Sequence, residues 1–188
     1  KLKLKQGGNT HVWDTRGKGA ERLKGMILWW ANLNGPKAVP GNYKVHLNVN
    51  GESMSQNLKI LPDPRAEVSV ADMQKQYDFI TSINETVDKA HKSIKKIRDV
   101  NAKLDAFVKR YKDTEATKAL VEKAKAMKER FGTIEKALYQ TKKRSNQDPW
   151  NFPIRLTNKR AHLNRLVSSD DVHPTEQDVA EKNERKGK

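Results

Sequence analysis

The chain has 188 residues and carries 38 Lys and Arg side chains against 23 Asp and Glu, a formal net charge of +15. It has no cysteine, which excludes disulfides, thiolate metal sites and a cysteine nucleophile. Its longest apolar run, residues 26–31, is far shorter than the roughly 20 residues that a membrane-spanning helix needs.

The spacing of the apolar residues changes at residues 62–65 (PDPR). Before this point apolar residues alternate with a period of two, which is typical of strands. After it they recur every three and four residues for about forty positions, which is typical of helices. The sequence therefore predicts a segregated α+β chain, with a small β domain at residues 1–65 and a coiled-coil-like helical bundle at residues 66–188.

A β-hairpin is the clearest local prediction in the first part. Apolar residues alternate with polar ones on both sides of Asn50-Gly51. This dipeptide favours a two-residue type I′ turn, because both turn positions need a positive φ. The turn places Leu47 opposite Met54, so the apolar residues share one face. They are Tyr43, Val45, Leu47, Val49, Met54, Leu58 and Ile60.

Three further strands are expected at residues 2–5, 11–14 and 26–30. Several short strands joined by glycine-rich turns indicate a small immunoglobulin-like or fibronectin-like β-sandwich. The sequence starts without Met and inside the first of these strands. We therefore expect an excised or processed piece of a larger protein, with a sandwich that is incomplete at its N-terminus.

The aromatic residues Trp29, Trp30, Tyr43 and Trp150 are the candidate contacts for a ligand or a partner. A tryptophan on a strand either buries a large apolar area in the core or forms a platform that stacks on a sugar ring. We favour a core position for Trp13 and for at least one of Trp29 and Trp30. Adjacent strand residues point to opposite faces, so the other member of that pair can reach the surface or a neighbouring domain.

A long helix is expected to begin at Ser69, which with Asp72 three residues later resembles a capping box. Between residues 73 and 111 apolar residues follow a heptad pattern. This pattern predicts a helix of about forty residues with a coiled-coil seam. Asn101 is the polar exception in the seam, and we interpret it as a register device or a solvated position.

The break at residues 112–114 predicts a short turn into a second, antiparallel helix. Two helices leave apolar surface exposed, so a third helix, at residues 154–167, should cover it. The expected apolar stripe of the second helix is Leu120, Ala124, Met127, Phe131, Ile134 and Leu138.

The connector between the second and third helices contains Trp150 and Phe152, which we expect to pin it against the helices. A loop at residues 168–174 then leads to a short fourth helix. Thr175 and Asp178 are the expected capping residues of that helix.

No catalytic constellation is present in the sequence. It contains no GxSxG, P-loop or GxGxxG motif, and no two of its five histidines share an HxH or HxxxH spacing. Asp170-Asp171 is interpreted as a solvated turn. We therefore expect no catalytic residue, no cofactor and no metal, and the chain is not expected to be an enzyme.

The positive charge is a further guide to partners. Residues 1–65 carry 11 basic and 4 acidic side chains, and residues 66–145 carry 19 and 12. A basic surface attracts nucleic acid, anionic lipid or acidic polysaccharide at low salt. No nucleic-acid-binding module is recognisable, so a specific nucleic-acid partner is not expected.

Several motifs, taken in order, resemble the C-terminal region of sortilin-like BNR-repeat proteins, which are large secreted bacterial proteins often labelled glycosyl hydrolases. The resemblance implies a β-propeller upstream of a small β-sandwich and a helical tail, and a secreted or cell-envelope location. It brings no catalysis, because the S-x-D-x-G-x-T-W box of the propeller repeats is absent here. The motifs are residues 12–16 (VWDTR), 25–29 (GMILW), 35–45 (GPKAVPGNYKV), 61–65 (LPDPR), 151–159 (NFPIRLTNK) and 174–177 (PTEQ).

The leading functional hypothesis is a non-catalytic accessory module that braces a propeller or binds another protein. Its discriminating feature would be an exposed apolar strip on the sandwich or on the helices. The first alternative is a carbohydrate-binding module in which Trp29 or Trp30 and Tyr43 stack on sugar rings. The second is binding of a polyanion, including nucleic acid, through the net positive charge, with an affinity that falls steeply with salt.

Overall fold

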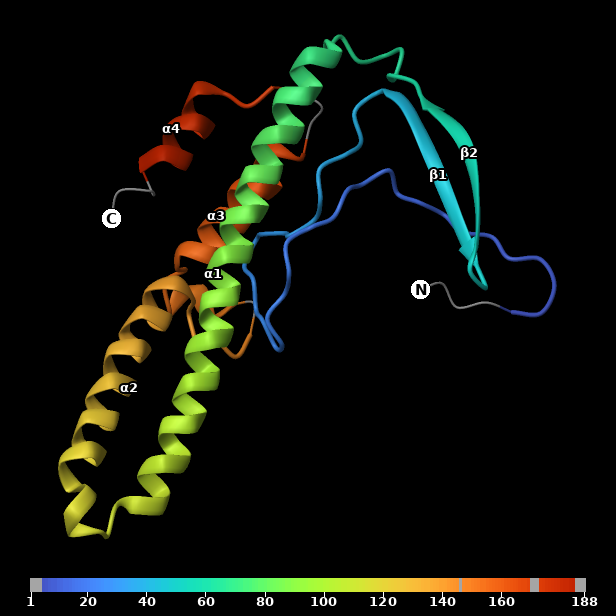
Figure 1. The fold of residues 1–188 in the computed structure, drawn as a ribbon. Helices are drawn as coiled ribbons and strands as arrows, with labels where there is room; N and C mark the ends of the chain where they lie inside the picture. Colours follow the sequence, from blue (N-terminus) through green and yellow to red (C-terminus); the bar gives the residue numbers. More distant parts are fainter. Residues whose placement is uncertain (1–4, 146, 170–172, 185–188) are drawn as a thin grey trace.

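The computed structural model describes residues 5–145, 147–169 and 173–184. It contains one β-hairpin followed by four α-helices, so the predicted segregated α+β class is confirmed (Figure 1). The elements are β1 (Gly41–Val49), β2 (Glu52–Ile60), α1 (Val70–Tyr111), the 3-10 helix η1 (Glu115–Thr117), α2 (Lys118–Leu138), the 3-10 helix η2 (Asp148–Trp150), α3 (Leu156–Val167) and α4 (Glu176–Glu184).

The hairpin forms as the turn chemistry predicts. Asn50 and Gly51 both have a positive φ, 51° and 93°, which is the geometry of a type I′ turn. β1 and β2 pair antiparallel with Leu47 opposite Met54 and Tyr43 opposite Leu58. The predicted register is therefore confirmed.

The predicted β-sandwich is wrong: within the described residues the sheet has two strands only, β1 and β2. Residues 11–14 and 26–30 form no strand, and residues 2–4 of the first expected strand lie outside the described part. The apolar run at 26–30 is preceded by a positive φ of 70° at Gly25 and ends in one of 45° at Trp30. These angles turn the chain out of the extended conformation that pairing requires.

The backbone of this run and of Asn32 just after it is paired with α3 and with Tyr139, the residue that follows α2, and not with a neighbouring strand. Asn158 of α3 hydrogen-bonds Trp29, and the hydroxyl of Tyr139 accepts from the N–H of Ile27 at 3.1 Å. The N–H of Asn32 donates to the carbonyl of Ala161 at 3.2 Å. A loop can lie against a core only when its backbone polar groups are paired in this way.

Two loop segments, residues 15–20 and 33–38, run antiparallel and very close together. The N–H of Gly17 donates to the carbonyl of Pro36, and the N–H of Ala20 to that of Leu33, each at 2.9 Å. A Cβ atom on Gly35 would lie only 2.0 Å from the carbonyl oxygen of Gly17. Glycine is needed here for the close approach of two backbones.

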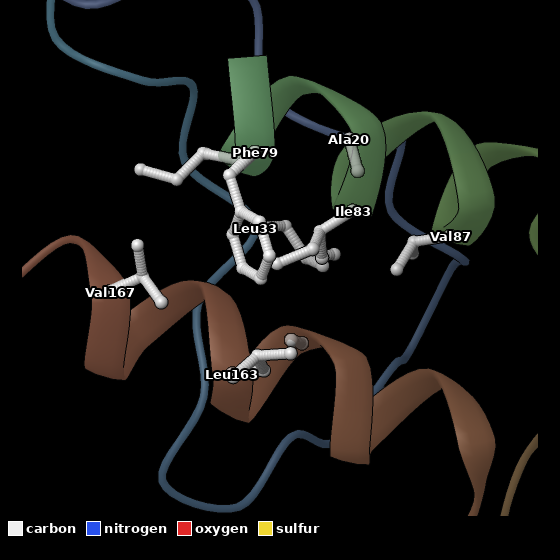
Figure 2. Close-up of a cluster of buried hydrophobic side chains, with 9 residues drawn as sticks. Ala20, Leu33, Phe79, Ile83, Val87, Leu163 and Val167 are labelled. Atoms are coloured by element: carbon white, nitrogen blue, oxygen red, sulfur yellow. The ribbon is translucent and has the colours of Figure 1, made fainter. Parts of the chain in front are cut away.

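The core lies where these loops meet α1 and α3 (Figure 2). Side chains from the N-terminal loop interleave with those of the two helices, and Leu163 and Ile83 are almost completely buried. Amide side chains continue the contact, since Nδ2 of Asn164 donates to Oδ1 of Asn84 at 2.7 Å. The apolar members are Ala20, Leu33, Phe79, Ile80, Ile83, Val87, Ala161, Leu163 and Val167.

Helix α1 agrees with the predicted length and cap. It spans 42 residues, and the hydroxyl of Ser69 accepts from the N–H of Asp72 at 3.1 Å. The seam is fully buried in its first half, at Ile80, Val87 and Ile94 among others. Farther along, Asn101 is half-buried, and its Oδ1 has no hydrogen-bond partner among the described residues.

Helix α2 packs antiparallel to α1, as predicted, but its predicted stripe is only partly correct. Val121 and Ala124 are buried against α1, whereas Leu120, Met127 and Ile134 are exposed. The predicted spacing of the apolar residues is correct. However, α2 is rotated about its axis so that three of them lie beside the surface that contacts α1, and not in it.

The C-terminal helices and the connector complete the fold. α3 packs on the first half of α1, with Nε2 of Gln76 donating to the carbonyl of Val167 at 2.7 Å. The expected cap of α4 is confirmed, since the hydroxyl of Thr175 accepts from the N–H of Asp178 at 3.2 Å. Trp150 does not pin the connector, because its side chain is 86% exposed.

Candidate interaction surface on the β-hairpin

The β-hairpin presents an apolar face that nothing in the described structure covers. Residues directly opposite each other across an antiparallel pair lie on the same face, so the register places the apolar residues of both strands together. We call this set the hairpin face, and its members are 38–56% exposed. It consists of Val45, Leu47, Val49, Met54 and Leu58.

The other face of the hairpin is polar. Lys44 lies opposite Asn57, and His46 lies opposite Ser55. The hairpin thus separates a largely apolar face, interrupted by Gln56 opposite Val45 and Glu52 opposite Val49, from a polar one. This is the pattern of a sheet with one side packed and one side solvated. A two-stranded hairpin alone is only marginally stable in water, and this one exposes apolar side chains on one of its sides.

Aromatic contacts anchor the base of the hairpin. The rings of Trp13 and Tyr43 meet edge to face with their centroids 6.4 Å apart. The hydroxyl of Tyr43 donates to the carbonyl of Val39 at 2.6 Å, and Nε1 of Trp13 donates to the carbonyl of Arg16 at 2.9 Å. Trp13 is 41% exposed, so the expectation that it belongs to the core is wrong.

Trp29 and Trp30 form a second aromatic group, in the loop that packs against α3. Their ring centroids are 6.2 Å apart; Trp29 is half-buried, whereas Trp30 is 63% exposed. The guanidinium of Arg165 lies 4.9 Å from the centroid of the Trp30 ring, and Nδ1 of His162 hydrogen-bonds the carbonyl of Trp30 at 2.6 Å. One member of the pair, Trp30, is thus on the surface, as expected. The expected reason was the alternation of side chains along a strand, but this segment is a loop and Trp30 has a positive φ.

The four predicted contact residues do not form one site. Trp29 and Trp30 contact each other, and Tyr43 contacts Trp13 at the base of the hairpin. Trp150 lies in η2, which contains none of the other three residues, and its side chain is 86% exposed.

Sequence analysis expected an exposed apolar strip on the sandwich or on the helices. It did not assign that strip to these hairpin residues, because they were expected to fill the core of a sandwich. The available signal was the alternation itself, which predicts a buried side whether the covering element lies in the same chain or in a partner.

The ionisable groups point to structural roles. Hydrogen bonds from the Arg65 guanidinium and backbone hold the pKa of Asp63 below its ordinary value, just after β2. Backbone N–H groups of Arg144 and Ser145 lower the pKa of Asp148 in the connector. Burial lowers the pKa of His91, whose Nδ1 hydrogen-bonds the carbonyl of Glu21 at 2.5 Å.

Neither a metal site nor a membrane span is found in the described part. Its histidines and carboxylates do not gather in any group of three or more that could hold a metal ion. None of its helices combines the length and the apolar character needed to cross a bilayer.

Comparison with known proteins adds no relative: no protein-family model, no curated protein and no solved structure matches this chain.

Proposed function

We propose that this chain is a non-catalytic interaction module that docks against another protein through the hairpin face. The observation that carries the proposal is the amphipathic hairpin, with five large apolar side chains exposed on one side and polar residues on the other. Contiguous exposed apolar patches on soluble proteins mark interaction sites. The polar reverse side indicates that only one side is meant to be covered.

The partner that suits this face best is the surface of another β-rich domain. Sheets pack face to face by interleaving apolar side chains, with their mean strand directions close to aligned. The resemblance to the C-terminal region of sortilin-like BNR-repeat proteins suggests a specific candidate, the β-propeller that precedes this region in that family. In this proposal the chain braces the propeller and acts outside the cytoplasm.

Calorimetry can test this with a separately produced propeller domain of a sortilin-like BNR-repeat protein as the probe. The unmodified chain is expected to bind it. Leu47→Glu, which puts a charge in the centre of the hairpin face, should weaken binding by more than about tenfold, or about 1.4 kcal/mol.

The matched control is Ser55→Glu. Ser55 lies on the polar face of the neighbouring strand, opposite His46, so the same charge there should leave the affinity unchanged. Equal losses from both variants, or no binding by the unmodified chain, would overturn the proposal.

Carbohydrate binding is the second candidate function, and the exposure of Trp30 favours it. An aromatic ring that is open to solvent can stack on the apolar face of a sugar. Tyr43 does not share this site, since its ring packs on Trp13. The check is a glycan array with the unmodified chain and Trp30→Ala: a glycan signal that disappears in the variant supports sugar binding, and an array without signal rejects it.

A further inference from the structure

A further group of exposed apolar side chains lies on α2. Leu120, Met127 and Ile134 are 45–54% exposed and follow each other at seven-residue spacing. At 3.6 residues per turn, seven residues return the chain to nearly the same side of a helix. The three side chains therefore form one stripe, next to the side of α2 that is buried against α1.

Helix α1 contributes a matching stripe. Val100 and Phe107 are half-buried and also lie seven residues apart. Each follows a seam residue, Ile97 or Leu104, by three positions, which turns it about 60° to one side of the seam. Met127 and Ile134 follow Ala124 and Phe131 on α2 by the same three positions.

Because the two helices run antiparallel, equal offsets in the same sense bring both stripes to one face of the helix pair. We call it the distal apolar face, and it comprises Val100, Phe107, Leu120, Met127 and Ile134.

Ion pairs mark the opposite side of the helix pair. Lys128 on α2 pairs with Asp105 on α1, and Nε of Arg98 lies 2.7 Å from a carboxylate oxygen of Glu135. Arg98 and Asp105 follow the seam residues Ile97 and Leu104 by one position, which turns them away from the stripe. One side of the helix pair thus carries ion pairs between α1 and α2, and the other side is apolar.

The distal apolar face is bordered by basic residues on both sides. On α1 they recur every seven residues, three or four positions from Val100 and Phe107; on α2 they lie three positions after Leu120 and Met127. No acidic side chain among the described residues pairs with Lys96, Lys123 or Arg130, whereas Lys103 pairs with Asp99 at 2.8 Å. The border consists of Lys96, Lys103, Arg110, Lys123 and Arg130, all exposed.

No third helix covers this face within the described structure. α3 has 12 residues and packs on the first half of α1, where Asn164 meets Asn84. In Figure 1 the ends of α1 and α2 near their connection extend beyond the other helices.

We propose that the distal apolar face binds an amphipathic helix of a partner protein, with apolar residues at heptad spacing and acidic residues flanking them. The heptad spacing on both helices is the pattern into which a third helix packs. The basic border selects acidic flanks through charge complementarity. A second copy of this chain does not fit, because two-fold packing of α2 on α2 would oppose Lys123 and Arg130 with like charges.

The experiment uses the full chain and synthetic peptides of about three heptads, with leucine at the two core positions. One peptide carries glutamate at the flanking positions and its control carries lysine. Calorimetry should show binding of the glutamate peptide that weakens as salt is added, and none of the lysine peptide. The peptide should also gain helical circular dichroism on binding.

Two charge-matched double variants locate the site. Lys123→Glu with Arg130→Glu reverses the border on α2 and should weaken binding at least about tenfold. Lys125→Glu with Lys136→Glu makes the same charge change on the far side of α2 and should change the affinity less than about twofold. Met127→Glu should abolish binding while leaving the helical content unchanged.

Three outcomes would overturn the proposal. These are equal binding of both peptides, no binding of either, and equal effects of the two double variants. Vesicles with and without anionic lipid serve as a further probe. Binding to anionic vesicles without binding to the glutamate peptide would replace the helical partner with a membrane surface.

Discussion

The side-chain amide of Asn158 pairs with both backbone groups of Trp29. Its Oδ1 accepts from the Trp29 N–H at 2.8 Å, and its Nδ2 donates to the Trp29 carbonyl at 2.9 Å. One side chain on a helix thus supplies the donor and acceptor that a neighbouring strand would otherwise provide. Asn158 is buried, so these bonds are largely shielded from water.

Asn158→Ala is expected to destabilise the fold by about 2 kcal/mol or more, because it leaves two backbone groups of Trp29 without a partner. Urea denaturation followed by circular dichroism measures the loss. Asn151→Ala, at an exposed position of the connector, is the control and should change stability by less than about 0.5 kcal/mol. Equal free energies of unfolding for the two variants would show that the bonds between Asn158 and Trp29 do not contribute to stability.

Gly35→Ala should lower the melting temperature, since the new Cβ would clash with the backbone of Gly17 and force the two loops apart. The expected cost is about 1–3 kcal/mol, as for other overpacked sites. Gly132→Ala is the opposite case. It lies within α2 with nothing inside 4 Å of the added Cβ and should stabilise by up to about 1 kcal/mol. If both variants shifted the melting temperature in the same direction, the proposed difference between the crowded Gly35 and the uncrowded Gly132 would be wrong.

Acid should weaken the fold through His91. Burial lowers its pKa below 6.5, the ordinary value, so the unfolded chain binds a proton before the folded chain does. Stability from this residue is therefore fully present above about pH 6.5 and falls as the pH drops toward the folded-state pKa.

The check is the free energy of unfolding between pH 7 and pH 5 for the unmodified chain and for His91→Gln. The variant should show a shallower fall over this interval, because it cannot take up the proton. Parallel pH profiles for the two proteins would exclude His91 as the source.

The hairpin face should contribute little to the stability of the free chain. Met54→Lys replaces a side chain that is already half in water and should change the free energy of unfolding by less than about 0.5 kcal/mol. Ile83→Ala, in the core of α1, should cost about 2–5 kcal/mol. A large loss from Met54→Lys would mean that the face is already packed within the chain.

Prediction from sequence succeeded where the signal was local. The Asn50-Gly51 turn specifies its own register, and the Ser69 and Thr175 caps need only the next turn of helix. The heptad pattern defines the length of α1 for the same reason.

Prediction failed where the outcome depends on residues far apart. An apolar run such as 26–30 reads the same in a buried strand as in a buried loop, and the loop here is held by Asn158, some 129 positions from Trp29. The pattern of α2 is equally ambiguous: spacing places Leu120 and Met127 on one side, but which side meets α1 depends on the turn before it. Both candidate interaction surfaces arise from such cases.

The length of α1 has a mechanical consequence. With 42 residues it is about 63 Å long at about 1.5 Å per residue. Residues 61–69 connect the β-hairpin to the first turn of α1. The α1 residues of the distal apolar face lie in the second half of the helix (Figure 1). The proposed distal apolar face extends along the half of α1 that lies away from the hairpin connection, so a partner that bound both proposed surfaces would have to reach along the helix. Under the two proposals, such a partner would gain avidity, because its second contact would be made within a complex that has already formed.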